Sequence, residues 1–142
     1  MARPSPVIDA SPVAALEDIL RARAMLEHVY LDEKIIQYIL DLVIATRPGC
    51  RKELSERQAG ARLDELDGLI SFGASPRASI ALALASRAAA LLAGRAYVLP
   101  QDVKAIAPDV LRHRIVLSYE AEAENINADA VITRLLAELR TP

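Results

Sequence analysis

The spacing of apolar residues along the chain predicts that helices are its main elements. Leu16, Ile19 and Leu20 recur at helical spacing. They follow Ser11-Pro12, a pair typical of a helix N-cap with proline at the first helical position. We therefore expect a first helix that begins at this pair and ends near Glu27.

A second helix is predicted after the short extended link Val29–Leu31. Asp32 can cap it, and Arg47-Pro48-Gly49 places a cation and two helix breakers at its end. Its broad apolar face, which we expect to be buried, consists of Ile35, Ile36, Ile39, Leu40 and Val43.

Residues 50–68 have a different character, because charges of both signs alternate and apolar side chains are few. We interpret them as a polar insertion with one loose helix near Leu63 and Leu66. Since the segment has little to bury, we expect it to be the most mobile internal part. Residues 1–11 are rich in proline and are interpreted as a tether, which leaves a single domain over residues 12–142.

Ser75-Pro76 repeats the pattern of a capping serine followed by proline, and it predicts an alanine-rich helix from there to Ala93. Gly94 is the residue expected to end this helix. We expect Ile80 and Leu84 to be buried in it, against the second helix.

The last part of the chain predicts shorter elements. Tyr97–Leu99 is expected to be extended and to pair with Ile115–Leu117, and a helix from Pro100 is expected to break at Pro108, before a brief turn over residues 109–113. Asn127 can cap a final helix. The fold class is therefore mainly all-α, a bundle of about five helices with a minor short β pair.

Composition supports one modest core. The chain has 142 residues, of which 53% are hydrophobic but only 4% aromatic, and its net charge is -2. One cysteine, Cys50, excludes an internal disulfide and favours a reducing compartment. We expect no signal peptide and no membrane span.

Several catalytic motifs are absent. No glycine is followed by lysine, which excludes a Walker A loop, and there is no G-x-G-x-x-G. His28 and His113 are far apart in sequence, so we expect no metal ligands. Val29–Glu33 has the form of a Walker B strand, but Asp32 is better explained as a helix cap. Gly73–Arg77 begins like a nucleophile elbow but has arginine where that motif needs glycine.

Arg77 is the most informative residue, because it follows Ser75-Pro76 at the start of a predicted helix. A cation is unfavourable there, since the helix N-terminus already carries partial positive charge. Arg77 is then either a surface arginine paired with a carboxylate or part of an anion site that suits a phosphate. Because the chain has no other part of a nucleotide site, another domain would hold that phosphate.

Four segments carry a resemblance to a known family. Gly73–Ala78 resembles the sensor 2 segment of the MoxR group of AAA+ ATPases. The similarity continues in Gly94–Lys104 and Ala107–Ser118, and upstream in Tyr38–Arg47. The charged stretch between these motifs is longer than the family pattern.

The resemblance implies the C-terminal lid domain of such an ATPase. A nucleotide-binding core would precede residue 1, and the proline-rich lead suggests a piece of a longer protein. Arg77 would be the catalytic sensor 2 residue that reaches the γ-phosphate, and Ser75, Pro76 and Arg77 would contact the nucleotide. ATP and Mg²⁺ are expected only in the full-length protein, with no cofactor and no metal ligand in this part.

The resemblance also implies partners: the protein's own core domain, neighbouring subunits of a hexamer, and a client protein that is remodelled in the cytoplasm. Two other interpretations remain open. One is a free-standing helical adaptor that binds through its alanine-rich helix. The other is a DNA-binding helix-turn-helix around Gly94–Pro100 with Arg112, His113 and Arg114 on phosphates, although the acidic net charge argues against nucleic acid.

Overall fold

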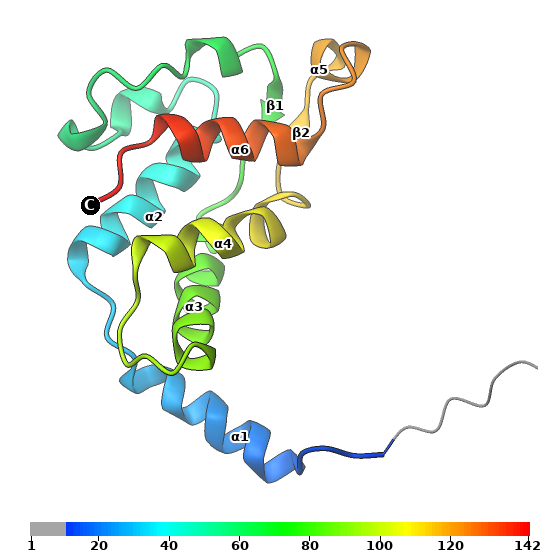
Figure 1. Ribbon diagram of the computed structural model, residues 1–142. Coiled ribbons are helices and arrows are strands. Elements are labelled where there is room, and N and C mark those ends of the chain that lie inside the picture. Colours follow the sequence, from blue (N-terminus) through cyan, green and yellow to red (C-terminus); the bar gives the residue numbers. More distant parts are fainter. Residues whose placement is uncertain (1–10) are drawn as a thin grey trace, which may run out of the picture.

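A computed structural model of the chain describes residues 11–142, so the tether predicted for residues 1–11 lies almost wholly outside the described part. The described part confirms the mainly α-helical fold class, with six α-helices and one short two-stranded sheet (Figure 1). The helices are α1 (Leu16–Met25), α2 (Glu33–Ala45), α3 (Arg77–Leu92), α4 (Pro100–Leu111), α5 (Tyr119–Ala123) and α6 (Ala128–Glu138). The strands are β1 (Ile70–Phe72) and β2 (Val116–Leu117), and the 3-10 turns are η1 (Leu26–His28), η2 (Arg51–Glu53), η3 (Glu56–Gln58) and η4 (Asp64–Leu66).

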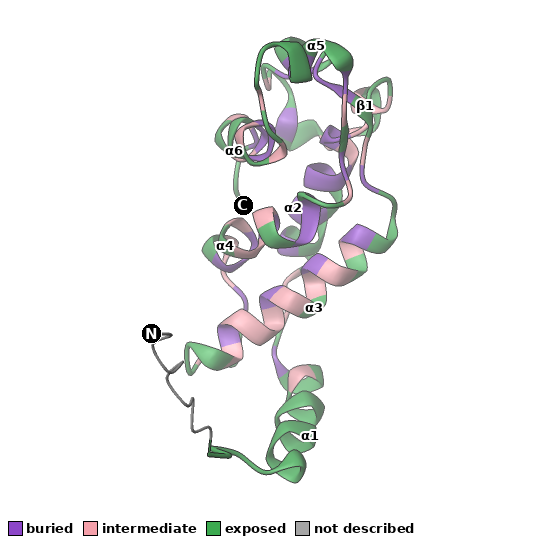
Figure 2. Ribbon diagram, turned by 90° about the vertical axis from the view of Figure 1, so that its right-hand side faces the viewer, coloured by how far each residue is buried: buried purple, intermediate pink, exposed green. Residues whose placement is uncertain are grey.

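The core lies where α2, α3, α4 and α6 pack together, and it is built almost entirely from aliphatic side chains (Figure 2). Tyr38 is its one fully buried aromatic residue among those described. Two helices have the side-chain N-caps that the sequence predicts. Asp32 accepts the Lys34 N–H at 2.8 Å at the start of α2, and Asn127 accepts the Ala130 N–H at 2.8 Å at the start of α6. The wholly buried side chains include Ile39, Leu42, Leu82, Val103, Leu111, Val131, Ile132 and Leu135.

The face that α3 buries differs from the prediction. Ile80 is 63% exposed and Leu84 is 50% exposed, whereas Leu82 is wholly buried. The buried positions recur every four residues along one ridge, namely Ala78, Leu82, Ser86 and Ala90. Small side chains on this ridge let α3 approach its neighbours closely, which outweighs the burial of the larger residues on the other face. In α2, Ile36 and Leu40 are likewise exposed beside a buried Ile35, Ile39 and Val43.

The predicted strand pairing was wrong. β2 pairs antiparallel with β1, with Ile70 opposite Leu117 and Phe72 opposite Val116. Tyr97 instead forms an isolated parallel bridge with Tyr30, through Tyr30 N–H to Ala96 O at 2.8 Å and Val98 N–H to Tyr30 O at 3.0 Å. The two extended links of the chain therefore satisfy each other's backbone groups.

The helix at Pro100 does not break at Pro108. α4 continues to Leu111, so residues 109–111 of the predicted separate turn belong to this helix, and residues 112–113 lie in the turn that follows it. An internal proline costs a helix about 3 kcal/mol through the lost hydrogen bond and the ring clash. Val103, Ala107 and Leu111 are all fully buried on the same side, and their packing offsets that cost.

α1 begins at Leu16 and not at Ser11-Pro12. The side chain of Asp18, in the first turn, accepts the N–H of Ala15 at 3.1 Å, so a carboxylate inside the helix closes its N-terminus. α1 extends away from the body of the molecule and has no buried residue (Figures 1 and 2).

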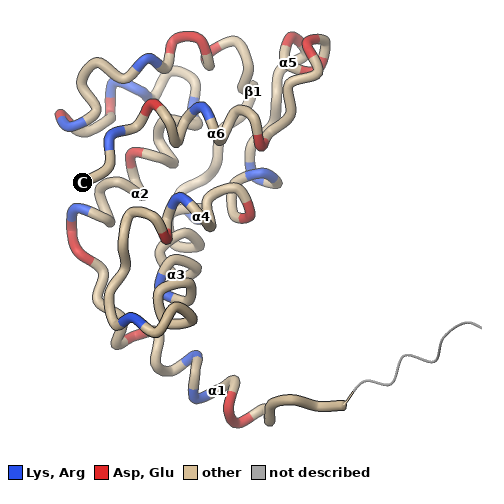
Figure 3. The backbone as a smooth tube through the Cα atoms, viewed as in Figure 1, with Lys and Arg blue, Asp and Glu red and all other residues tan. Residues whose placement is uncertain are grey.

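The insertion over residues 50–68 buries more of its side chains than its composition predicted. The expected loose helix is replaced by three 3-10 turns, and Leu63 and Leu66 are both buried. Charges of both signs do alternate along it (Figure 3). Its anchor is the fully buried Asp41 of α2, which accepts hydrogen bonds from Ser55 N at 3.0 Å, Ser55 Oγ at 2.6 Å and Gln58 Nε2 at 3.2 Å.

Candidate functional site

Arg77 is the first residue of α3, and its side chain is exposed. The predicted cap by the Ser75 side chain is wrong. Pro76 occupies the N-cap position and no side chain caps the helix, although the Ser75 carbonyl accepts the Ala78 N–H at 2.8 Å. The first turn of α3 contains no acidic residue, so nothing within the helix neutralises the positive charge at its N-terminus.

Four of the described arginines make ion pairs, and Arg77 is not among them. Ion pairs join Arg21 to Asp18, Arg51 to Asp67, Arg95 to Asp102 and Arg112 to both Asp109 and Asp129. Among residues 11–142, Arg77 makes no ion pair and no side-chain hydrogen bond. Of the two interpretations that its position left open, pairing with a nearby carboxylate is therefore not observed.

The loop that precedes Arg77 is held by the end of α2. Thr46 is fully buried, and its hydroxyl donates to Val43 O at 2.6 Å and accepts the Ala74 N–H at 2.9 Å. Arg47 Nε donates to Ala74 O at 2.7 Å. A Cβ placed on Gly73 would lie 2.3 Å from the Thr46 carbonyl oxygen, so only glycine permits this approach of the two backbones.

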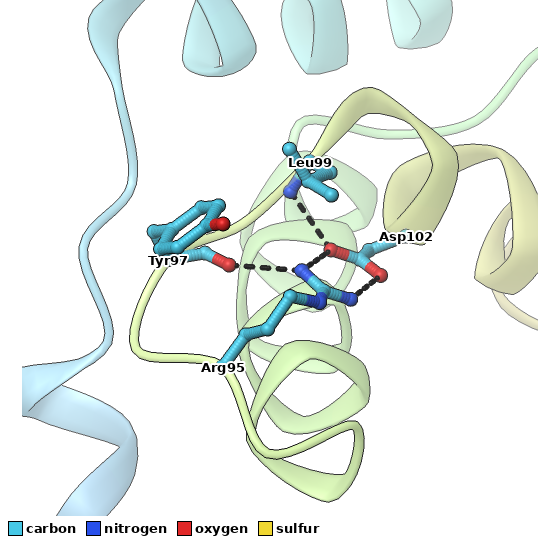
Figure 4. A network of polar contacts seen from close by, with 4 residues as sticks. All are labelled: Arg95, Tyr97, Leu99 and Asp102. Atoms are coloured by element: carbon cyan, nitrogen blue, oxygen red, sulfur yellow. Dashed lines mark hydrogen bonds and ion pairs between the residues drawn. The ribbon is translucent and has the colours of Figure 1, made fainter.

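The other end of α3 is fixed as well. Gly94, at φ +72°, donates to Leu91 O while Arg95 N–H donates to Ala90 O, the paired bonds of a Schellman motif. Arg95 then binds Asp102 of α4 (Figure 4). The hydrogen bonds from Arg95 and from the Leu99 N–H lower the pKa of the Asp102 carboxyl below its usual value, and burial opposes them only in part.

Within residues 11–142, no group of three or more His, Cys, Asp or Glu could hold a metal ion. A hollow of about 320 Å³ lies among residues 51–64 of the insertion, and one of about 280 Å³ lies between η1 and the end of α3. Arg77 lines neither of them. No helix in this part of the chain is long and apolar enough to cross a membrane.

Sequence reasoning singled out Arg77 as a candidate but did not identify the residues that hold the turn before it. Thr46 and Arg47 belong to a segment that the sequence marks only as the end of a helix, and the contact to Ala74 spans more than 25 positions. Asp102 had a local signal, because it stands three residues after Leu99 at the start of a proline-initiated helix, where an acidic side chain can cap.

Comparisons with known proteins identify the family of the chain. Residues 67–135, which contain the sheet, α3 to α5 and the larger part of α6, match the AAA lid domain family. The chaperone MoxR1 of Mycobacterium tuberculosis is 37% identical over 133 residues, which is 94% of this chain and 33% of that protein. The chain is a lid domain of the MoxR family of AAA+ ATPases. The resemblance inferred from the sequence is thereby confirmed.

Two further relatives support the assignment of the lid. The protein MoxR of Paracoccus denitrificans is 39% identical over 110 residues, or 75% of this chain and 30% of that protein. A crystal structure of a protein assigned as an ATPase from Cytophaga hutchinsonii is 37% identical and superposes with a TM-score of 0.76 over 89% of the lid and 36% of that chain. The lid therefore spans about a third of the length of these relatives.

Proposed function

We propose that this lid senses the nucleotide held by an AAA+ core domain of the same longer protein, with Arg77 as the residue that contacts the γ-phosphate. The observation that carries the proposal is the exposed guanidinium of Arg77 at the start of α3, without a carboxylate partner among the described residues. Ser75 and Pro76 precede it in the same exposed turn and would lie beside the nucleotide.

The chemistry of this position suits a phosphate. Unpaired backbone N–H groups at a helix N-terminus attract anions, and a guanidinium presents a planar fork of donors that matches phosphate oxygens. The charge that develops during phosphoryl transfer is stabilised by such a cation, by about 10³-fold or more in rate where the contact is complete. ATP and Mg²⁺ would be held by the core, since this chain has neither a Walker A nor a convincing Walker B motif.

The uncovered apolar surface of α1 supports a neighbouring domain. Leu16, Ile19 and Leu20 are each at least half exposed, although they form one stripe. Exposed stripes of this kind mark interaction surfaces. We assign the core domain, together with the adjacent subunits of a hexameric ring, as what covers this side of the lid.

Motion of the lid with nucleotide state would drive the remodelling of client proteins. One relative is named a chaperone, and the lid would couple ATP hydrolysis to that kind of work in the cytoplasm. A single unpaired cysteine, Cys50, agrees with a reducing compartment.

The free-standing adaptor is the second candidate, and its binding surface is partly occupied. α3, which would present the adaptor surface, packs against both α2 and α4, and its alanines are mostly buried or half-buried (Figure 2). The DNA-binding interpretation meets a similar obstacle, because Arg112 is paired with two aspartates and Arg114 donates to the Val110 carbonyl.

The test is ATP turnover of the full-length protein with Arg77→Ala. We expect a loss of about 10³-fold, by analogy with other cations on a transferring phosphoryl group. Arg77→Lys should recover only part of it, because it keeps the charge but not the fork. Arg134→Ala removes an exposed arginine of α6 that has no ion pair among the described residues, and it should leave turnover unchanged. Normal turnover of Arg77→Ala, with the lid folded, would overturn the proposal.

A further inference from the structure

The turn that presents Arg77 is fixed from both sides. Ala74 and Ala78 are fully buried, while Arg77 between them is exposed. Pro76 has a restricted φ, which leaves Ser75 and Arg77 as the residues with freedom to rotate. The direction in which Arg77 leaves the surface therefore depends on where Ala74 is held.

Thr46 and Arg47 are the residues that hold Ala74. The Thr46 hydroxyl accepts its N–H at 2.9 Å, and Arg47 Nε donates to its carbonyl at 2.7 Å. Both polar groups of the Ala74 backbone are thus bound to the end of α2 and not to other residues of its own loop. The close approach of Gly73 to the Thr46 backbone leaves the loop no space to shift toward α2.

These contacts give the end of α2 control over the geometry of Arg77. We propose that Thr46 and Arg47 are positioning residues, which act on ATP hydrolysis only through Arg77 by fixing the Gly73–Pro76 turn. The inference rests on the proposed role of Arg77. Its physical basis is that a misplacement of about 1 Å at a reacting group can reduce a rate about 100-fold, even when the mutation is remote from the chemistry.

The first measurement examines how firmly the end of α2 holds Ala74, in this chain and without nucleotide. Thr46→Val keeps the shape of the side chain but removes the acceptor for the Ala74 N–H, so amide hydrogen exchange at Ala74 should become faster. Thr46→Ser retains the hydroxyl and should restore protection. Thr133→Val is the matched control, because it removes a hydroxyl that donates to the Asp129 carbonyl on an exposed face of α6. It should leave Ala74 unchanged.

The second measurement is a double-mutant cycle on ATP turnover of the full-length protein. Thr46→Val should lower kcat about tenfold or more, Thr46→Ser should recover most of it, and Thr133→Val should have no effect. In the Arg77→Ala background, Thr46→Val and Arg47→Met should cause no further loss, because the residue that they position is gone. Arg47 is half-buried, so this variant tests the inference even if Thr46→Val proves too unstable to purify.

The outcomes separate this inference from the proposed function. If Arg77→Ala leaves turnover normal, the proposed function fails, and the positioning role fails with it. If Arg77→Ala is impaired but Thr46→Val and Arg47→Met turn over normally, only the positioning role is overturned. An additive loss in the Arg77→Ala background would show that Thr46 or Arg47 acts on the nucleotide independently of Arg77, which also contradicts the inference.

Discussion

Arg95 and Asp102 form a two-pronged ion pair that joins the end of α3 to the start of α4. Arg95 Nη1 lies 2.8 Å from Asp102 Oδ2, and Nη2 lies 2.6 Å from Oδ1 (Figure 4). Oδ2 also accepts the Leu99 N–H at 2.8 Å, so the same carboxylate caps α4. One acidic residue thereby joins the segment after α3 to the first turn of α4, the helix against which α3 packs.

The ion pair makes the free energy of unfolding depend on pH in the acidic range. Because the pKa of Asp102 is lowered in the folded protein, its carboxylate stabilises the fold above the ordinary aspartate pKa of about 3.9, and this stabilisation is lost as the pH falls below that value. Asp102→Asn should cost about 1–3 kcal/mol at pH 7 through the lost charge-assisted bonds. The measurement is urea unfolding of both proteins at pH 7, 4 and 3.

The difference in the free energy of unfolding between the native protein and Asp102→Asn should decrease from pH 7 to pH 3. Glu120→Gln, a change at an exposed carboxylate of α5, should behave like the native protein throughout. If this difference in the free energy of unfolding stays constant with pH, the charge of Asp102 does not contribute to stability.

Leu82 and Leu84 test which face of α3 is buried. Leu82→Ala should lower the free energy of unfolding by about 2–5 kcal/mol, because Leu82 is fully buried and its loss leaves a cavity. Leu84→Ala, at a half-exposed position two residues further on, should cost less than about 1 kcal/mol. Denaturant melts of the two variants check this order, and equal losses would contradict the packing described for α3.

The anchor of the insertion can be tested at Asp41. Asp41→Ala leaves the bonds from Ser55 and Gln58 without an acceptor, and we expect a loss of about 2–4 kcal/mol. Glu56→Ala, at an exposed position in the same segment, should change stability by less than about 0.5 kcal/mol. Hydrogen exchange should show the Ser55 amide protected in the native chain and unprotected in Asp41→Ala. If the Ser55 amide exchanges equally fast in both proteins, Asp41 does not anchor the insertion.

The fold could be predicted where the signal is local. The caps at Asp32 and Asn127, the glycine that ends α3 and the fold class all follow from short sequence patterns. Periodicity could not decide which face of α3 is buried, since both Leu82 and Leu84 are apolar and the choice depends on how closely other helices approach. The partner of Tyr97 was equally beyond local reasoning, because the bridge joins it to Tyr30, far away in the sequence.

The same limit applies to the site. Arg77 stands out because a cation at a helix N-terminus conflicts with a local rule, and such conflicts often mark function. Thr46 and Asp41 conflict with no rule as written in the sequence. Their roles arise only when the chain brings Ala74 and Ser55 against the buried end and side of α2.

The central claim, that Arg77 faces the γ-phosphate, is tested most directly by nucleotide affinity. The full-length protein and its Arg77→Ala variant would be titrated with ADP and with a non-hydrolysable ATP analogue, in the presence of Mg²⁺. A charge-assisted contact of about 1.5–3 kcal/mol corresponds to an affinity change of about 10- to 100-fold. We predict that loss for the triphosphate alone, with ADP affinity unchanged. Equal affinities of the variant and the native protein for the triphosphate, or an equal loss for both nucleotides, would contradict the account.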